Sequence, residues 1–282
     1  MNTATTPAQA PILEADDIRL AYPRAGAAPH IVLQSFSLRL APGETIAILG
    51  SSGVGKSSLL RVLAGLQQTG HGSVRLKGEP LNGPHPRSSF VFQDPSLLPW
   101  LTLEENVGFG LDFKRQPGIG KAEKQARVRA AIEEVGLHGA NARYPAELSG
   151  GMAQRAALAR SLARQPEILL LDEPFSALDE VTRSDMQTLL QTLIARHGTA
   201  AVLVTHDIDE ALILADRIIL IGDSPGRTIG EWALTAGHPR DPLAPEPSRM
   251  RLEIMKLLRE HRRGSPTGRS GSRDGTPAEA AA

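Results

Sequence analysis

Three observations predict an α/β protein with a mainly parallel sheet. Strand-like apolar runs alternate with helix-like periodic segments from residue 167 to residue 221. A glycine-rich loop, Gly50–Ser58, lies between an apolar run and an amphipathic segment. A second apolar run, Ile168–Leu171, ends in two carboxylates, Asp172 and Glu173. Continuous apolar runs of this kind are typical of parallel strands that are buried on both faces.

The composition limits the classes of function open to the chain. Its 282 residues are 41% hydrophobic and 22% charged, as in an ordinary soluble globular domain. The 31 basic and 31 acidic residues cancel, so we expect no nucleic-acid partner. The lack of cysteine excludes disulfides, thiolate nucleophiles and Cys-ligated zinc. With no signal-peptide pattern and no run near about 18 apolar residues, the chain itself is not expected to cross a membrane.

The N-terminal part is predicted to contain an antiparallel β portion. Residues 1–11 are rich in Thr, Ala and Pro and are expected to be disordered. Apolar and polar residues alternate in Ile12–Leu20 and Ile31–Leu40, as in half-exposed strands. Pro23–Pro29 is interpreted as the loop that joins them.

The middle of the chain changes from strands to helices. Gly72–Leu76 and Ser88–Phe92 are predicted to be short strands. From Asp94 to Arg164 only helical periodicity is found, interrupted by proline and glycine, which indicates a helical insert in the α/β core. The predicted helices of this insert are Leu103–Phe113, Ala122–Val135 and Met152–Arg164.

Strands and helices alternate again towards the C-terminus, which indicates a parallel sheet covered by helices on both faces. A final amphipathic helix is predicted at Arg249–Arg262, and the polar tail 264–282 is expected to be disordered. The predicted strands are Glu167–Leu171, Ala200–Val204 and Arg217–Ile221, and the predicted helices are Glu180–Arg196 and Ile208–Ala215.

The glycine-rich loop has the pattern of a phosphate-binding loop. It matches GxxxxGK[ST] and lies between the predicted strand Thr45–Leu49 and a helix that begins near Lys56. Glycines let backbone N–H groups converge on phosphate oxygens, the helix N-terminus attracts the same anion, and Lys56 can reach the terminal phosphates. Ser57 is the predicted magnesium ligand. A glycine-rich turn that only caps a helix is the alternative. The predicted phosphate-binding residues are Gly50, Ser51, Ser52, Gly53, Val54, Gly55, Lys56, Ser57 and Ser58.

The two carboxylates after Ile168–Leu171 form the second candidate group. They stand at the carboxyl end of a predicted strand, where open α/β sheets bind their ligands. We expect Asp172 to hold magnesium beside Ser57, and Glu173 to act as general base on an attacking water. A helix-capping Asp-Glu pair is the alternative.

The segment Leu148–Arg155, LSGGMAQR, supplies a second helix N-terminus that can bind an anion. One nucleotide does not need two such sites from one chain. If two copies pair about a twofold axis, Ser149, Gly150 and Gly151 of one copy can cover the nucleotide on the phosphate-binding loop of the other. A plain N-cap is the alternative.

Six motifs in this order resemble the ATP-binding subunit of ABC transporters, over about residues 12–230. Met152 departs from the glutamine that is most common after the glycines of the signature. The matching segments are Gly50–Ser58 for the Walker A motif, Gln93 for the Q-loop, Leu148–Arg155 for the signature, Ile168–Pro174 for Walker B, Ser176–Asp179 for the D-loop and Val204–Asp207 for the switch histidine, His206.

This resemblance implies a P-loop NTPase fold, with a RecA-like core and a helical subdomain at about residues 95–164, that binds ATP and Mg²⁺. Tyr22 would stack on adenine, and His206 would contact the γ-phosphate. Gln93 would contact magnesium or water and report the nucleotide state to the helical insert. Asp179 would join the nucleotide-binding set. The implied catalytic residues are Lys56, Gln93, Glu173 and His206, and the implied metal ligands are Ser57, Gln93 and Asp172.

The resemblance also implies a transport motor, with the ATPase domain at 12–235 and a helical extension at 236–263. A homodimer would close on ATP and drive a separate permease at the cytoplasmic face of the membrane, and a solute-binding protein would select the cargo. Phe92–Trp100 and Ser224–Glu231 resemble the nitrate, sulfonate and taurine importers. The alternatives are an importer of another small solute, a soluble ABC-type ATPase and a P-loop kinase. Pro95 and Pro99 disfavour a simple buried helix in Asp94–Trp100, and Trp100 is the predicted permease anchor. A place in the ordinary core of the helical insert is the alternative.

Overall fold

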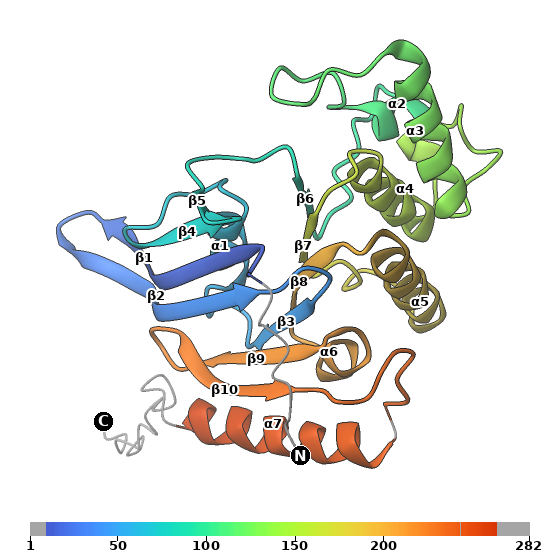
Figure 1. Cartoon of the computed structure of the whole chain (residues 1–282). Coiled ribbons are helices and arrows are strands. Elements are labelled where there is room, and N and C mark those ends of the chain that lie inside the picture. Colours follow the sequence, from blue (N-terminus) through green and yellow to red (C-terminus); the bar gives the residue numbers. More distant parts are fainter. Residues whose placement is uncertain (1–9, 243, 264–282) are drawn as a thin grey trace, which may run out of the picture.

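Helix α1 (Lys56–Leu63) lies between two β-sheets in the computed structural model (Figure 1). The structure describes residues 10–242 and 244–263. The expected disorder of residues 1–9 and 264–282 concerns parts of the chain outside these ranges.

Six strands form the main sheet, in the order β10-β9-β3-β8-β7-β6. Every neighbouring pair is parallel except β9 and β10, which confirms the predicted mainly parallel sheet. The central strands β3, β7 and β8 are buried along their whole length, and this burial explains their continuous apolar sequences. The strands are β3 Thr45–Gly50, β6 Ser88–Val91, β7 Ile168–Asp172, β8 Ala200–Thr205, β9 Arg217–Gly222 and β10 Arg227–Ala233.

Four antiparallel strands form the second sheet, in the order β2-β1-β4-β5. The predicted loop Pro23–Pro29 is wrong, because β1 and β2 continue through it and Arg24 pairs with Ala27 at the hairpin end. A shift in register between Tyr22 and Arg24 accommodates Pro23, which has no N–H to donate. The strands are β1 Leu13–Arg24, β2 Ala27–Leu40, β4 His71–Leu76 and β5 Glu79–Pro80.

Alternate residues of the central strands face different helices. Ile46 and Ile48 of β3 pack with α1 and the antiparallel sheet, whereas Ala47 and Leu49 pack with α6 and α7. Strands β7 and β8 pack with α4 and α5 on that second face. The C-terminal helix α7 begins four residues before its predicted start. These helices are α4 Gly150–Leu162, α5 Glu180–His197, α6 Ile208–Leu214 and α7 Pro245–Arg263.

The predicted helical insert is confirmed, and it lies beyond the β6 edge of the main sheet (Figure 1). It consists of α2 (Leu103–Gly108), α3 (Lys121–Glu134), the 3-10 helix η1 (Pro145–Glu147) and α4. Helices α2, α3 and α4 share one apolar core with β7. The predicted helix Leu103–Phe113 is too long. Helix α2 ends at Gly108, because Phe109 is extended and Gly110 turns the chain with φ of +90°.

Candidate functional site

The loop between β3 and α1 requires glycine at two positions. A Cβ atom on Gly50 would lie 2.6 Å from the carbonyl oxygen of Ile221. Gly55 has φ of +99°, and a Cβ atom there would lie 2.7 Å from Cγ1 of Val32. The backbone of this loop can therefore approach a ligand that bulkier residues would keep away.

The side chain of Lys56 folds back over this loop. Its Nζ donates hydrogen bonds to the carbonyl oxygens of Gly50 (2.9 Å) and Ser51 (3.1 Å), and it lies 3.9 Å from Oε1 of Glu173. The residue is only 4% exposed. Burial lowers the pKa of the Lys56 ammonium, and the carboxylates of Glu173 and Asp172 oppose this change. A buried cation in this position can neutralise an anion in the loop.

Ser57 and Asp172 meet directly, although they are 115 positions apart. The Ser57 hydroxyl donates a 2.7 Å hydrogen bond to Oδ1 of Asp172, the last residue of β7. Burial raises the pKa of Asp172, and the hydrogen bond from Ser57 opposes this rise. A hydroxyl and a carboxylate are hard oxygen ligands, and Mg²⁺ typically takes one or two such protein groups together with phosphate oxygens and water. The pair therefore fits the predicted magnesium site.

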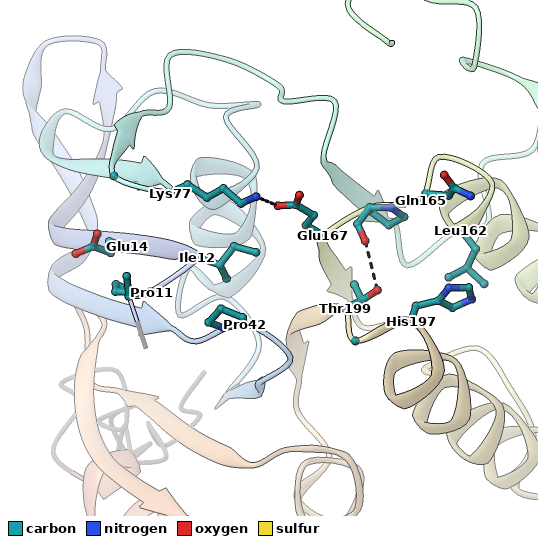
Figure 2. A pocket seen from close by; sticks show the side chains of 14 residues that line it. Pro11, Ile12, Glu14, Pro42, Lys77, Leu162, Gln165, Glu167, His197 and Thr199 are labelled. Carbon is teal, nitrogen blue, oxygen red and sulfur yellow. Dashed lines mark hydrogen bonds and ion pairs between the residues drawn. The ribbon is translucent and has the colours of Figure 1, made fainter. Parts of the chain in front are cut away.

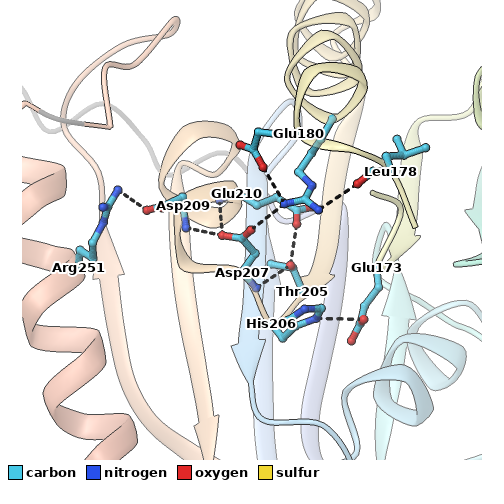
Figure 3. A network of polar contacts seen from close by, with 10 residues as sticks. Glu173, Leu178, Glu180, Thr205, His206, Asp207, Asp209, Glu210 and Arg251 are labelled. Atoms are coloured by element: carbon cyan, nitrogen blue, oxygen red, sulfur yellow. Dashed lines mark hydrogen bonds and ion pairs between the residues drawn. The ribbon is translucent and has the colours of Figure 1, made fainter. Parts of the chain in front are cut away.

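Glu173 and His206 form a second pair beside the first. Nδ1 of His206 lies 3.1 Å from Oε2 of Glu173, and Figure 3 shows the two side chains pointing toward each other from adjacent strand ends. Glu173 has φ of +44°, and its N–H donates to the carbonyl of Val204 on the neighbouring strand β8. A left-handed conformation outside glycine is uncommon and is found where surrounding structure enforces it. This backbone conformation places the Glu173 side chain at the carboxyl ends of the strands, where its Oε1 lies 3.9 Å from Nζ of Lys56.

Tyr22 and Gln93 lie at the borders of this group. The Tyr22 hydroxyl, from β1, donates a 2.8 Å hydrogen bond to Oγ of Ser58, and the residue is 38% exposed. Gln93 stands two residues beyond β6 with an exposed side chain. Ser52 and Gly53 are exposed in the loop itself.

The signature and D-loop residues are separated from the phosphate-binding loop. Ser149 caps α4 by accepting a hydrogen bond from the N–H of Met152, and Asp179 caps α5 by accepting from Thr182. Ser149, Gly150, Gly151 and Asp179 line a cavity of about 650 Å³ whose lining includes no residue of Gly50–Ser58. Within one chain, the two predicted anion sites are therefore distinct.

A further cavity, of about 690 Å³, lies at the amino ends of β7 and β8, and its lining includes Glu167 and Thr199 (Figure 2). Lys77 and Glu167 form an ion pair across it, and Thr199, just before β8, donates a hydrogen bond to the carbonyl of Pro166. None of the predicted site residues lines this cavity, whereas the predicted phosphate-binding and acidic residues gather at the carboxyl ends of β3 and β7.

The polar residues that surround the His206 turn were not predicted from the sequence. Thr205 and Glu210 are buried and hydrogen-bonded to each other, and Arg183 of α5 lies 3.8 Å from Asp207. An acid in the first turn of a short helix has the pattern of an exposed capping residue, so no signal in the sequence distinguished Glu210.

A strand, a glycine loop, a helix N-terminus and an acidic strand end together define a P-loop nucleotide-binding protein. The chain belongs to the ABC transporter family, whose model matches residues 33–176. The aliphatic sulfonates import ATP-binding protein SsuB 2 of Burkholderia lata is 46% identical and covers 81% of each chain. The nitrate import ATP-binding protein NrtC of Synechococcus elongatus is 41% identical, over 86% of this chain and 36% of its own length.

Solved structures agree with this family. The dimeric post-hydrolysis structure of the ATP-binding cassette MJ0796, bound to ADP and Pi, is 31% identical with a TM-score of 0.70 and covers 80% of this chain and 100% of its own. The predicted fold and family are thus confirmed, and the chain is an ATPase of the ABC type. Among residues 10–242 and 244–263, no helix combines the length and apolar character needed to span a membrane.

Proposed function

We propose that the site at the carboxyl ends of β3, β7 and β8 binds MgATP and hydrolyses it. The observation that carries this proposal is the convergence of Lys56, Ser57, Asp172 and Glu173, from two separate motifs, at one end of a parallel sheet. The loop N–H groups and the Lys56 ammonium bind the phosphates, and Tyr22 stacks on adenine from the neighbouring β1.

Ser57 and Asp172 hold the metal, with Gln93 as a further ligand when the helical insert moves toward the nucleotide. Magnesium, when bound, neutralises phosphate charge and orients the β- and γ-phosphates. Glu173 accepts a proton from the attacking water, and His206, 3.1 Å from Glu173, orients that water and contacts the γ-phosphate.

The site requires a second copy of the chain. Within one chain, Ser149, Gly150, Gly151 and Asp179 line a cavity that contains no residue of the phosphate-binding loop. In a twofold dimer these residues cover the nucleotide bound to the other copy, and two equivalent sites result. The dimeric cassette among the solved relatives supports this arrangement.

The dimer drives import of a small oxyanion through a separate membrane permease. Relatives named for aliphatic sulfonate and nitrate import support this assignment and a location at the cytoplasmic face of the membrane. The substrate class includes nitrate, sulfonates and taurine, and a solute-binding protein delivers the substrate to the permease. The substrate class is inferred from these relatives, because the predicted site residues of this chain bind the nucleotide rather than the cargo.

The permease is proposed to contact the helical insert near Trp100. Trp100 is 69% exposed and lies in a turn, and the adjoining Leu101 lines a cavity of about 900 Å³ together with Phe109, Phe113 and Val128. An exposed aromatic residue beside an apolar cavity is the arrangement that receives a short helix of a partner.

Phosphate release from MgATP by the purified chain, without any phosphate acceptor, tests the catalytic part of the proposal. Wild type is expected to release phosphate, and Lys56→Ala is expected to lose activity about 100-fold or more. Lys77→Ala, in the cavity at the amino ends of β7 and β8, is the matched control and retains the wild-type rate. Equal rates in all three proteins would contradict the assignment, and an acceptor requirement would favour a kinase.

Co-expression with candidate permeases and solute-binding proteins tests the transport part. In vesicles, the ATPase rate is expected to rise when the solute-binding protein carries a sulfonate or nitrate. If only another solute stimulates the ATPase, the chain serves an importer of a different substrate class. If no permease copurifies, a soluble ATPase is favoured.

A further inference from the structure

The turn that carries His206 is fixed by the hydroxyl group of the preceding residue. Thr205 is the last residue of β8 and is 1% exposed. Its Oγ1 accepts a hydrogen bond from the N–H of Asp207 at 3.0 Å and donates one to Oε2 of Glu210 at 2.7 Å. The hydroxyl group therefore connects the strand, the turn and the first turn of α6 (Figure 3).

Glu210 is built into this arrangement as a buried acceptor. It is 4% exposed, its own N–H donates to Oδ1 of Asp207 at 3.2 Å, and its second oxygen, Oε1, has no hydrogen-bond partner. A buried carboxyl that lacks one partner is costly to the folded state. An apolar residue at this position could not accept the hydrogen bond from Thr205.

We propose that Thr205 and Glu210 are positioning residues that orient His206 toward Glu173 during ATP hydrolysis. This inference rests on the proposed function, because it acts through the His206–Glu173 pair. With Thr205 held from both sides, the backbone between β8 and α6 keeps one conformation, and the imidazole stays within reach of the carboxylate.

Removal of either partner breaks the connection without altering the phosphate-binding loop. Lys56, Ser57 and Asp172 make their contacts through other elements, so the affinity for ATP is expected to remain within about twofold of wild type. The turnover number is expected to fall about tenfold, which is the effect of one lost hydrogen bond of ordinary strength.

The test compares Thr205→Val with Thr205→Ser, which restores the hydroxyl group. The matched control is Thr199→Val, because Thr199 is also buried, stands beside the other end of the same strand and donates to a carbonyl group. We expect a tenfold lower turnover number only in Thr205→Val. If Thr205→Val does not fold by circular dichroism, Glu210→Ala removes the same bond, and Glu210→Gln restores an acceptor.

A readout of His206 itself separates positioning from general destabilisation. The ring resonance of His206, assigned by its loss in His206→Ala, is expected to shift in Thr205→Val and to stay unchanged in Thr199→Val. An unmoved resonance, or a wild-type turnover number in both Thr205→Val and Glu210→Ala, overturns the inference while ATP hydrolysis stands. A wild-type protein that does not hydrolyse ATP overturns the proposed function and this inference together.

Discussion

Replacing Glu210 by glutamine is expected to change how the free energy of unfolding depends on pH. Burial raises the pKa of Glu210 from 4.5 to about 7. The hydrogen bond from Thr205 and the charge of Arg183 oppose this rise, whereas Asp207 and Glu173 add to it. These groups, from β8, α5, the turn and the end of β7, face the carboxyl group.

The direction in which the free energy of unfolding changes with pH follows from proton binding. Because the pKa in the folded state lies above the unfolded value of 4.5, the folded protein binds more protons than the unfolded chain between pH 4.5 and about 7. The free energy of unfolding therefore falls as the pH rises through this window. A difference of about 2.5 pH units, at about 1.4 kcal/mol each, corresponds to about 3 to 4 kcal/mol. Glutamine has no proton to release, so Glu210→Gln lacks this fall.

Urea unfolding followed by circular dichroism, at several pH values from 4.5 to 8, measures the effect. The difference between Glu210→Gln and wild type is expected to grow by about 3 to 4 kcal/mol across this range in favour of the variant. Glu133→Gln, at an exposed position on α3, is the control for the same chemical change at the protein surface. A difference for Glu210→Gln that does not depend on pH would show that the pKa of Glu210 is not raised in the folded protein.

Two further substitutions test the borders of the site. Tyr22→Ala is expected to weaken ATP binding by about 1 kcal/mol in calorimetry. Tyr22→Phe keeps the ring and is expected to retain most of the affinity. Unchanged affinity in Tyr22→Ala would show that Tyr22 is not part of the site. Trp100→Ala is expected to leave folding and basal ATP hydrolysis nearly intact, because the side chain is 69% exposed, but to weaken permease assembly and transport in vesicles. Leu252→Ala, 68% exposed on α7, is its control, and wild-type transport by Trp100→Ala would exclude Trp100 from the interface.

The parts of the fold that could be predicted are those that local pattern determines. The continuous apolar runs of β3, β7 and β8 indicated buried parallel strands, and Gly50–Ser58 indicated the loop between β3 and α1. The hairpin at Pro23–Pro29 could not be predicted in this way. Its strands are extended by cross-strand pairing, and prolines are tolerated there at an edge strand and at a shift in register.

In the candidate site, too, the residues within local motifs could be predicted, and those that depend on tertiary packing could not. Ser57 and Asp172 were predicted to lie together because one belongs to the phosphate-binding loop and the other ends a buried strand. The structure places Oγ of Ser57 2.7 Å from Oδ1 of Asp172. The connection between Thr205 and Glu210 was not predicted, because its meaning depends on burial that only tertiary packing creates. Strand β10 was also missed, since Gly230 interrupts its alternating pattern and its pairing with β9 decides its conformation.

The state of Glu173→Gln in MgATP shows whether Glu173 is the general base of a dimeric ATPase. Glutamine keeps the shape of the side chain and leaves Ser57 and Asp172 intact, but it cannot accept the proton of the attacking water. Size-exclusion chromatography with light scattering, together with phosphate release, reports both assembly and turnover. We predict a stable dimer that retains ATP and scarcely hydrolyses it. A monomer that hydrolyses ATP at the wild-type rate would exclude Glu173 as the general base.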